Sequence, residues 1–264
     1  MSAGTFAKDV GGEVTFLARE LKAPMIASTF AALGDQAREQ GWSHEEYLAA
    51  VLGRQVASRA ANGTRMRIGA AHFPAIKTLE DFTFAHVPSS TRDVIAHLAT
   101  TVFIARKENV VLLGPPGTGK THLAIALAIK AAEGTYPVAF DSATAWITRL
   151  AEAHDRGRLA SELRHLNRYR LLVIDEVGYL PFDTASAALF FQLIASRYET
   201  GSIILTSNLA FSRWGETLGD DVVAAATIDR LVHHAHVIAL DGDSYRTRAH
   251  RTGPPPAAIS TTKQ

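Results

Sequence analysis

The sequence predicts an α/β protein: a three-layer sandwich on a parallel five-stranded sheet, preceded by a small all-helical N-terminal domain. Two observations predict this fold. From Asn109 onward, short apolar runs that read as strands alternate with longer segments of helical periodicity, as in parallel sheets with crossover helices. The first hundred residues instead carry helical patterns alone. With 264 residues, 47% of them hydrophobic, the chain can bury an α/β core and a smaller appendage.

The composition excludes several classes of protein. The chain has no cysteine, which excludes disulfides, thiolate metal sites and thiol catalysis. Its first residues lack the basic and apolar regions of a secretory signal. The longest unbroken apolar run, residues 123–129, is far shorter than the roughly 20 residues of a membrane span. We therefore expect a soluble, cytoplasmic protein without membrane association.

Charge is distributed unevenly although the formal net charge is only +1. Residues 1–51 carry seven acidic and four basic side chains, whereas residues 52–79 carry five basic and no acidic ones. An acidic module followed by a basic stretch suggests a contact with protein and then one with nucleic acid. A solvated surface explains each segment equally well.

The N-terminal domain, residues 1–61, is expected to hold two or three short helices. One apolar helical face stops before Pro24. Ser43-x-x-Glu46 is a capping box that opens a further helix. Asn62-Gly63 then breaks the pattern. Because so few helices bury little surface alone, we interpret this segment as an adaptor or oligomerisation domain.

Residues 62–90 are expected to form a basic connector with little periodicity. Any of its three phenylalanines, Phe73, Phe82 and Phe84, could stack on adenine, although an aromatic side chain here could also simply seal the domain edge. A helix is expected from about Thr91 to Lys107 because its apolar residues fall on one face.

The α/β domain is expected to span residues 91–250. Its strands are expected at 110–113, 137–141, 171–175, 202–206 and 236–240. Its helices are expected at about 120–133, 143–154, 159–168, 184–198 and 221–233. The polar, proline-rich residues 251–264 are expected to form a disordered tail.

The first strand runs into Gly-Pro-Pro-Gly-Thr-Gly-Lys-Thr, the G-x-x-x-x-G-K-[ST] phosphate-binding loop. Its glycines let backbone N–H groups approach phosphate oxygens, and the following helix points its positive end at them. Lys120 is expected to reach the β- and γ-phosphates, and Thr121 to ligate Mg²⁺. The candidate nucleotide-binding residues are Gly114, Pro115, Pro116, Gly117, Thr118, Gly119, Lys120, Thr121 and His122.

A pair of carboxylates, Asp175 and Glu176, follows four apolar residues of the third expected strand. Ligands of open α/β sheets lie at this end of the strands. Asp175 is the expected carboxylate on the Mg²⁺ side. Glu176 can act as the general base for a water molecule. Such a pair is often structural by itself, but after a phosphate-binding loop it favours hydrolysis over binding alone.

Three further polar residues are candidates for catalysis. Asn208 ends a buried strand and can hold the attacking water or the γ-phosphate, although it could equally form an Asx turn. Arg230, near the end of its helix, could reach the γ-phosphate of a neighbouring subunit, or pair with Asp229. Arg246 follows the last strand and could approach the phosphates of its own chain.

The helical segment between the second and third strands is rich in arginine. Such a segment could contact DNA through its phosphates, largely without sequence preference, or could be a solvated helix face. The candidate DNA-binding residues are Arg149, Arg156, Arg158, Arg164 and Arg168.

Three histidines, His233, His234 and His236, raise the possibility of a metal site. No acid or cysteine lies at ligand spacing beside them in the sequence, and the run crosses a helix–strand junction. We therefore do not expect a metal there.

Four stretches together resemble one protein family. They are Gly-Pro-Pro-Gly-Thr-Gly-Lys-Thr-His-Leu-Ala at 114–124, Asp-Glu-Val-Gly-Tyr-Leu-Pro at 175–181, Thr-Ser-Asn at 206–208, and Asp-Arg-Leu followed by Ser-Tyr-Arg at 229–246. They look like the IstB-like transposition helper ATPases, AAA+ proteins of the same clade as DnaC and DnaA. The resemblance covers about residues 65–250, and the 175–181 motif is far more specific than the phosphate-binding loop.

The resemblance implies roles that the residues alone leave open. It implies an AAA+ core in which Asn208 is sensor 1, Arg230 the arginine finger and Arg246 a sensor-2-like group, with no C-terminal helical lid. It implies ATP and Mg²⁺ as cofactors, a homo-oligomer that assembles on duplex DNA with ATP, and the cognate DDE transposase of an insertion sequence as partner. In this clade an extra helix before the Asp-Glu strand faces DNA.

Two other functions fit parts of the pattern. A replicative helicase loader of the DnaC type would share the fold, and binding to a helicase would distinguish it. A small-molecule kinase would share the phosphate-binding loop, but Glu176 beside Asp175, Asn208 and the missing lid stand against it. A GTPase is disfavoured because the sequence has no Asn-Lys-x-Asp guanine motif.

Overall fold

The computed structural model describes residues 9–85 and 87–240, and the chain divides into two compact units. The N-terminal unit is Met1–Met66 and the C-terminal unit is Arg67–Gln264. Helix α3 (His44–Ala70) contains the boundary. The helix break predicted at Asn62-Gly63 is therefore wrong. A glycine costs a helix about 1 kcal/mol, which a helix of 27 residues can tolerate.

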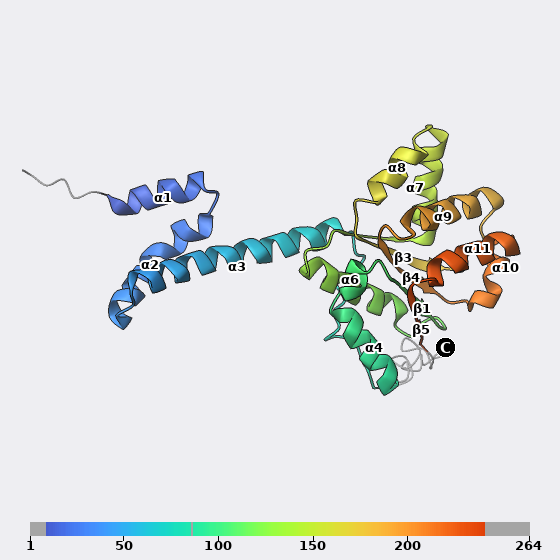
Figure 1. Cartoon of the computed structure of the whole chain (residues 1–264), viewed down its shortest axis with the longest axis horizontal. Helices are drawn as coiled ribbons and strands as arrows, with labels where there is room; N and C mark the ends of the chain where they lie inside the picture. The colour runs from blue at the N-terminus through green and yellow to red at the C-terminus, as the bar shows by residue number, and fades with distance from the viewer. Residues whose placement is uncertain (1–8, 86, 241–264) are drawn as a thin grey trace, which may run out of the picture. The chain divides into compact units, whose positions relative to one another are not determined.

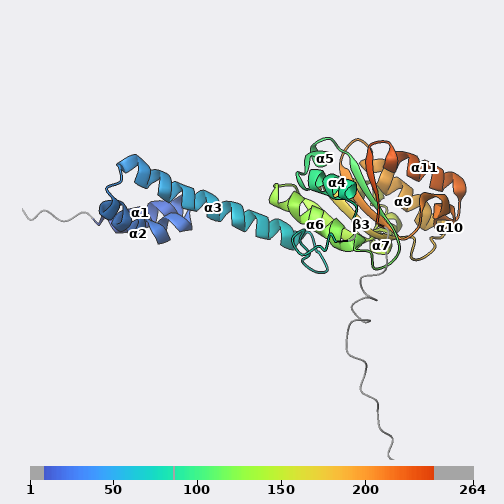
Figure 2. The same ribbon diagram turned by 90° about the horizontal axis from the view of Figure 1, so that it is seen from below.

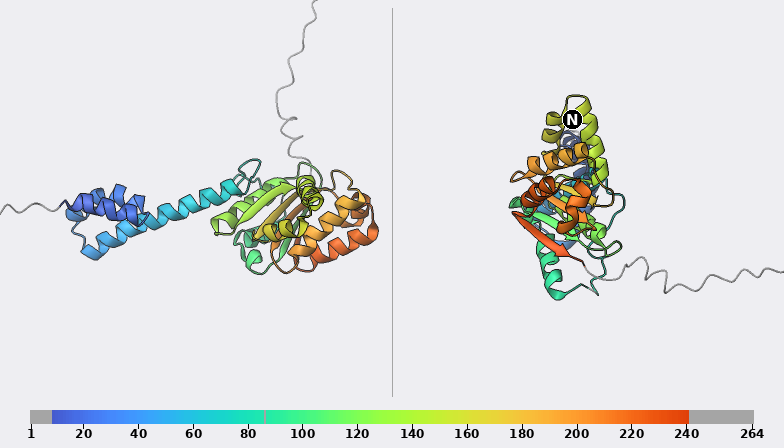
Figure 3. Two further views of the ribbon diagram at one scale, coloured as in Figure 1. Left: turned by 90° about the horizontal axis from the view of Figure 1, so that it is seen from above. Right: turned by 90° about the vertical axis from the view of Figure 1, so that its right-hand side faces the viewer.

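The N-terminal unit consists of α1 (Val10–Glu20), α2 (Pro24–Gln40) and the first part of α3 (Figure 3). The predicted capping box is confirmed: Glu46 N–H donates to Ser43 Oγ at 3.2 Å, and Ser43 N–H donates to the Glu46 carboxylate at 2.7 Å. Pro24, which the sequence marked as a helix end, also begins α2, a position that proline favours. The function of this unit stays a prediction.

The C-terminal unit is built on a parallel sheet with the strand order β2-β3-β4-β1-β5 (Figure 1). Its strands are β1 (Asn109–Leu113), β2 (Val138–Ser142), β3 (Leu171–Val177), β4 (Ser202–Ser207) and β5 (Ala235–Ala239). Its main helices are α4 (Ser89–Ala99), α6 (Lys120–Glu133), α7 (Ala143–Asp155), α8 (Leu159–Leu166), α9 (Thr184–Arg197) and α11 (Asp221–Val232). The five predicted strands and the five helices predicted after residue 109 are confirmed.

Two details of the helices differ from the prediction. The single helix expected over residues 91–107 is two, α4 and the short α5 (Val102–Ala105). Thr101 lies between them in the left-handed region, with φ 63°, which no helix interior accommodates. After β4, the 3₁₀ turn η1 (Phe211–Arg213) and α10 (Trp214–Leu218) were not predicted, because a five-residue helix has no readable periodicity.

The sheet has a separate apolar core on each face. Residues of α4, α5 and α6 pack with Leu112 and Val173 on one face. Residues of α7 to α11 pack with Val111 and Leu172 on the other. Figure 2 shows α4, α5 and α6 on one side of the sheet and α9, α10 and α11 on the opposite side. The predicted three-layer sandwich is confirmed.

The expected tail at 251–264, and the expected absence of a lid, concern residues beyond those that the structure describes. Among the described residues, no helix is both long and apolar enough to cross a membrane.

Arg197, the last residue of α9, is a buried cation that is held by backbone carbonyls. Its side chain is only 1% exposed, and burial lowers its pKa to about 10, so it stays charged at neutral pH. Its guanidinium donates to the carbonyl oxygens of Tyr169 at 2.8 Å and Ser202 at 3.1 Å. It donates further to the carbonyls of Leu166 and Arg170. Arg197 thus fixes the chain between α8 and β3 against the start of β4.

We expect Arg197→Met to lower the free energy of unfolding by roughly 2–4 kcal/mol. The carbonyls of Leu166 and Arg170 would keep a backbone donor, but those of Tyr169 and Ser202 would lose the guanidinium, and each unpaired buried group costs about 1–3 kcal/mol. Chemical denaturation of the purified variant measures the loss. Arg213→Met is the matched control, since Arg213 is exposed and pairs with Glu216 in water. Equal losses for the two variants would contradict a structural role for Arg197.

Candidate functional site

The loop from Gly114 to Gly119 joins β1 to α6 and begins the site. Gly119 has φ 94°, and a Cβ atom there would lie 2.8 Å from the ring of Phe82, so the position requires glycine. Lys120 is 6% exposed, and its Nζ donates to the carbonyl oxygens of Gly114 at 2.7 Å and Pro115 at 2.8 Å. The lysine thus lies folded over the loop whose backbone would receive a phosphate group.

Asp175 lies beside Thr121, in the first turn of α6. Thr121 Oγ1 donates to Asp175 Oδ1 at 3.0 Å, and Thr206 Oγ1 donates to the same oxygen at 2.5 Å. The Thr206 hydroxyl also accepts from the Glu176 N–H at 2.9 Å. Thr206 is not among the site residues predicted from the sequence. Its position at the end of a buried strand, two residues before Asn208, was the signal that could have identified it.

Glu176 points away from the buried Asp175 because β3 is bulged there. Ile174 pairs with Leu205 and Val177 with Ser207, so β3 has one residue more than β4 between these pairs. Glu176 has φ 64° and an exposed side chain, whereas Asp175 is only 5% exposed. A bulge of this kind commonly redirects a side chain beside an active site. It turns Glu176 into the pocket above the phosphate-binding loop.

Asn208 has a buried side-chain oxygen that accepts no hydrogen bond from any residue that the structure describes. The Asx turn considered from the sequence is therefore not made by this oxygen. Ser207 Oγ forms the local bonds instead, with the N–H and carbonyl of Leu209. Buried polar atoms are rarely left unpaired, so Asn208 Oδ1 is available to a ligand or water in the site.

Lys120, Thr121, Glu176 and Thr206 line a pocket of about 510 Å³, whereas Asp175 and Asn208 lie behind its lining. One wall is the phosphate-binding loop with Glu176 and Thr206, and the other is the connector from Pro74 to Thr83. Phe82 lines the pocket, whereas Phe73 packs edge-on against Phe140 in the core at 5.9 Å between ring centroids. Of the three phenylalanines, Phe82 is thus the one best placed to contact a nucleotide base.

His122 also lines this pocket and fastens the connector to α6. Its Nε2 lies 2.8 Å from the carbonyl oxygen of Thr78, and its ring lies 5.3 Å from that of Phe82. Phe84 in turn packs on Phe82 at 4.8 Å. This chain of contacts sets the width of the pocket.

Arg230 is not among the residues that line the pocket of its own chain. Its guanidinium lies over the rings of Phe191 and Tyr198, 5.5 Å from each centroid. No ion pair joins it to Asp229 among the described residues. Arg246 lies outside the described part of the chain.

The five candidate DNA-binding arginines fall into two groups. Arg149 pairs with Glu162 at 2.7 Å and Arg156 with Glu152 at 3.2 Å. The other three are exposed, and within residues 9–85 and 87–240 no acidic side chain pairs with them. These three are Arg158, Arg164 and Arg168.

The chain was compared with known proteins. A family model described as "IstB-like ATP binding protein" matches residues 16–253. Over 239 residues, the chain is 41% identical to the insertion sequence IS21 ATP-binding protein of Pseudomonas aeruginosa, covering 90% of each. It is 40% identical over 231 residues to the insertion sequence IS5376 ATP-binding protein of Geobacillus stearothermophilus, covering 88% of this chain and 92% of the relative.

Among solved structures, the chain is similar to AMPPCP-bound DnaA from Aquifex aeolicus. The TM-score is 0.53 at 22% identity, over 68% of this chain and 54% of DnaA, so the chain spans about half of that protein's length. At this identity the likeness concerns the fold alone, and it confirms the predicted fold of the core.

Gly178 offers a test of how tightly Asn208 is held. A Cβ atom at Gly178 would lie 2.9 Å from Asn208 Oδ1 and 3.0 Å from Leu209 Cδ1, and φ there is 96°. We expect Gly178→Ala to lower the free energy of unfolding more than Gly157→Ala does. Gly157 also has a positive φ, 65°, but a Cβ atom there meets nothing within 4 Å. Both replacements add backbone strain of about 1–2 kcal/mol, and Gly178→Ala adds the contacts with Asn208 and Leu209.

Thermal or chemical unfolding of both variants measures this difference. Adding Asn208→Ala to Gly178→Ala should recover part of the extra loss, because the oxygen that the new Cβ meets is gone. Equal destabilisation by the two glycine replacements would show that Asn208 has room to move.

Proposed function

The chain belongs to the family of IstB-like ATP-binding proteins, and from this premise we propose that it hydrolyses ATP, assembles on duplex DNA and assists the transposase of an insertion sequence. The observation that carries the hydrolytic part is the arrangement around Asp175. One buried carboxylate oxygen accepts from the hydroxyls of Thr121 and Thr206, and the next residue, Glu176, extends into the pocket. A protein that only held a nucleotide would not need this second carboxylate.

The spacing of two oxygen atoms supports a Mg²⁺ site. Thr121 Oγ1 and Asp175 Oδ1 are 3.0 Å apart. Neighbouring ligands of an octahedral ion with bonds of about 2.0–2.1 Å lie about 3 Å apart. When bound, Mg²⁺ supplies positive charge to the β- and γ-phosphate oxygens.

Two side chains of the pocket, Lys120 and Glu176, and the nearby Asn208 can then take distinct roles in hydrolysis. Lys120 exchanges its two carbonyl partners for phosphate oxygens, which form stronger, charge-assisted hydrogen bonds. Glu176 accepts the proton of the attacking water. Asn208 Oδ1, which is unpaired among the described residues, can accept a hydrogen bond from that water and so orient it.

Arg230 is proposed to act on the nucleotide of a neighbouring subunit. It does not line its own pocket, and two aromatic rings hold its guanidinium. An arginine finger supplied by a neighbour would make hydrolysis depend on assembly. Arg246 is proposed to contact the phosphates of the nucleotide that its own chain binds.

DNA contact is proposed for the exposed arginines of the α7–α8 region. Arg158, Arg164 and Arg168 carry no acidic partner among the described residues, so their charge is available for phosphates. Arg149 and Arg156 could join them only by leaving Glu162 and Glu152. Contacts of this type would be largely independent of sequence.

The transposase is proposed as partner because the relatives are named as proteins of insertion sequences. The N-terminal unit is proposed as the module for that partner or for self-association. A helicase loader is the alternative, and the same relatives favour the transposition role over it. Binding of the purified chain to its cognate transposase, against a replicative helicase, separates the two.

The roles of Glu176 and Lys120 can be separated by measurement. We expect Glu176→Gln to bind ATP normally and to lower steady-state hydrolysis by about 10²-fold or more, since the general base is lost. Lys120→Ala should weaken binding of a fluorescent nucleotide, because the phosphates lose a cationic partner. Lys130→Ala, on the same helix but outside the pocket, is the control. Normal turnover by Glu176→Gln would remove Glu176 from the mechanism.

The action of Arg230 in trans can be tested by mixing subunits. Arg230→Ala should bind ATP normally but hydrolyse it poorly, with a loss that reaches at most about 10³–10⁵-fold. Mixed with Lys120→Ala, it should regain part of the turnover, since each variant supplies what the other lacks. If no mixing ratio restores turnover, Arg230 acts in its own chain or only structurally.

The DNA contact can be tested by charge reversal. Arg164→Glu combined with Arg168→Glu should weaken binding to two unrelated duplexes and leave nucleotide binding intact. The logarithm of affinity should also fall less steeply with log salt, by about 0.9 for each phosphate that is no longer neutralised. Fluorescence anisotropy at several salt concentrations, with an ATP analogue present, measures both.

The matched control is the double variant Arg92→Glu with Arg106→Glu. It changes the net charge by the same amount as the first pair, but on the side of the sheet covered by α4 and α5. If both pairs weaken binding alike, the effect is one of net charge, and the α7–α8 arginines hold no DNA.

A further inference from the structure

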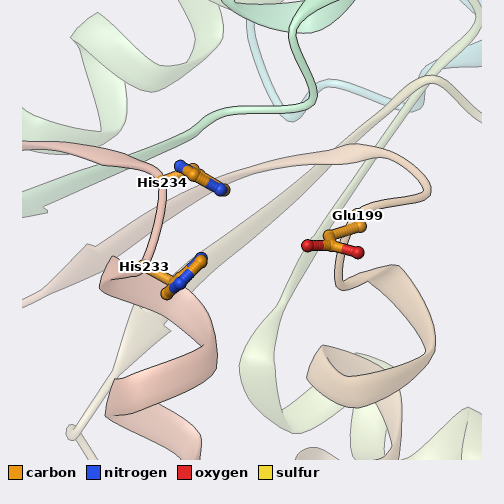
Figure 4. Close-up of side chains that lie close together, drawn as sticks. All are labelled: Glu199, His233 and His234. Atoms are coloured by element: carbon orange, nitrogen blue, oxygen red, sulfur yellow. The ribbon is translucent and has the colours of Figure 1, made fainter.

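Three potential metal ligands that are distant in sequence lie together at the end of α11. Glu199 is in the turn after α9, and His233 and His234 follow the last turn of α11 (Figure 4). One ligand atom from each residue lies within 4.8 Å of the other two. All three side chains are exposed. The acid that the sequence analysis missed beside the histidines therefore comes from another element.

The surrounding contacts prepare His233 for a ligand. Its Nδ1 lies 3.2 Å from the hydroxyl of Tyr198, and its ring packs edge-on against that of His234 at 4.3 Å between centroids. When Nε2 is the metal ligand, Nδ1 carries the proton and donates to Tyr198 Oη. Metal-bound histidines nearly always have such a partner, which fixes the ring and its tautomer.

Glu199 adopts an unusual backbone conformation at this point. Its φ of 55° lies in the left-handed region, which costs a residue with a Cβ atom about 1–2 kcal/mol. Lys22 and Lys107 have the same conformation just after other helices, so it is here a feature of the helix end. Here the conformation carries the carboxylate toward the two imidazoles.

We propose that Glu199, His233 and His234 bind a divalent transition metal of the Zn²⁺ class. Two imidazole nitrogens and one carboxylate oxygen suit Zn²⁺, Co²⁺ or Ni²⁺, whereas Mg²⁺ and Ca²⁺ select oxygen ligands. The ligand atoms of a tetrahedral Zn²⁺ ion with bonds of about 2.0–2.1 Å lie about 3.4 Å apart. Small rotations of exposed side chains bring the three atoms to that spacing, and the fourth position takes water.

The third histidine of the run does not belong to this site. His236 Nε2 lies 3.1 Å from the carboxylate of Glu108, and its ring faces His97 at 6.2 Å. The site is also distinct from the proposed Mg²⁺ position, since none of its three ligands lines the pocket around Lys120.

The metal site and Arg230 share one side chain, Tyr198. The hydroxyl of Tyr198 contacts His233, and its ring lies under the Arg230 guanidinium. A bound ion would hold His233, and through it the ring that supports Arg230. The idea that this ring supports a contact between subunits rests on the proposed function. Binding of the ion itself does not depend on the proposed function.

Metal binding is measured on the full chain without a histidine tag, nucleotide or DNA. The result therefore does not depend on whether the proposed function is correct. Zn²⁺ is titrated in competition with a chromophoric chelator, and Co²⁺ is titrated by its visible absorption. We expect one ion per chain. His233→Gln and Glu199→Gln should each weaken binding by about 10-fold or more, and Tyr198→Phe by about 10–100-fold.

His236→Gln is the matched control and should bind as tightly as the wild type. Zn²⁺ should also raise the melting temperature of the wild type but not that of His233→Gln, because an ion that binds the folded state stabilises it. Unchanged melting of His233→Gln without metal shows that it is folded. The proposal is overturned if the wild type binds no stoichiometric ion, if binding survives His233→Gln, or if His236→Gln weakens it equally.

Discussion

The carboxylate of Asp175 is the point on which the site depends. A buried charge is tolerated only when hydrogen bonds replace its water, and here the hydroxyls of Thr121 and Thr206 do so. The strand order explains how hydroxyls from two different elements reach Asp175. Strand β4 lies between β1, which leads into the phosphate-binding loop, and β3, which carries Asp175. Because Thr206 at the end of β4 is small and polar, Thr121 of α6 and Asp175 of β3 can come together beside it.

Local sequence signals predicted most of the fold, because each strand is a largely apolar run and each longer helix after residue 109 has a clear periodicity. Where the sequence misled or fell short, the physical reasons differ. The break at Asn62-Gly63 was inferred from two residues, whereas a long helix averages its propensities over many more. The roles of Thr206 and Glu199 depend on neighbours far away in sequence, one across the sheet and one across two packed helices. No spacing rule shows such neighbours.

The site and the arginine-rich region are joined by one buried residue. Arg197 binds the carbonyls of the segment between α8 and β3, which includes Tyr169 and lies beside Arg168, and also that of Ser202 at the start of β4. The far end of β4 carries Thr206 and Asn208. A displacement of the α8 region by DNA would therefore reach β4 through a rigid set of hydrogen bonds. If DNA binds there as proposed, this connection would carry the contact toward the site. If Arg230 acts in trans as proposed, hydrolysis would also depend on a neighbouring subunit.

The central claim is that one chain holds the nucleotide and the next completes the site. Cryo-electron microscopy of the assembly on duplex DNA, with a non-hydrolysable ATP analogue and Mg²⁺, tests it most directly. We expect the γ-phosphate beside Lys120 of one subunit and the guanidinium of Arg230 from the adjacent subunit within about 3 Å of it. A nucleotide contacted by its own chain alone, with Arg230 still between Phe191 and Tyr198 in every subunit, would contradict the account.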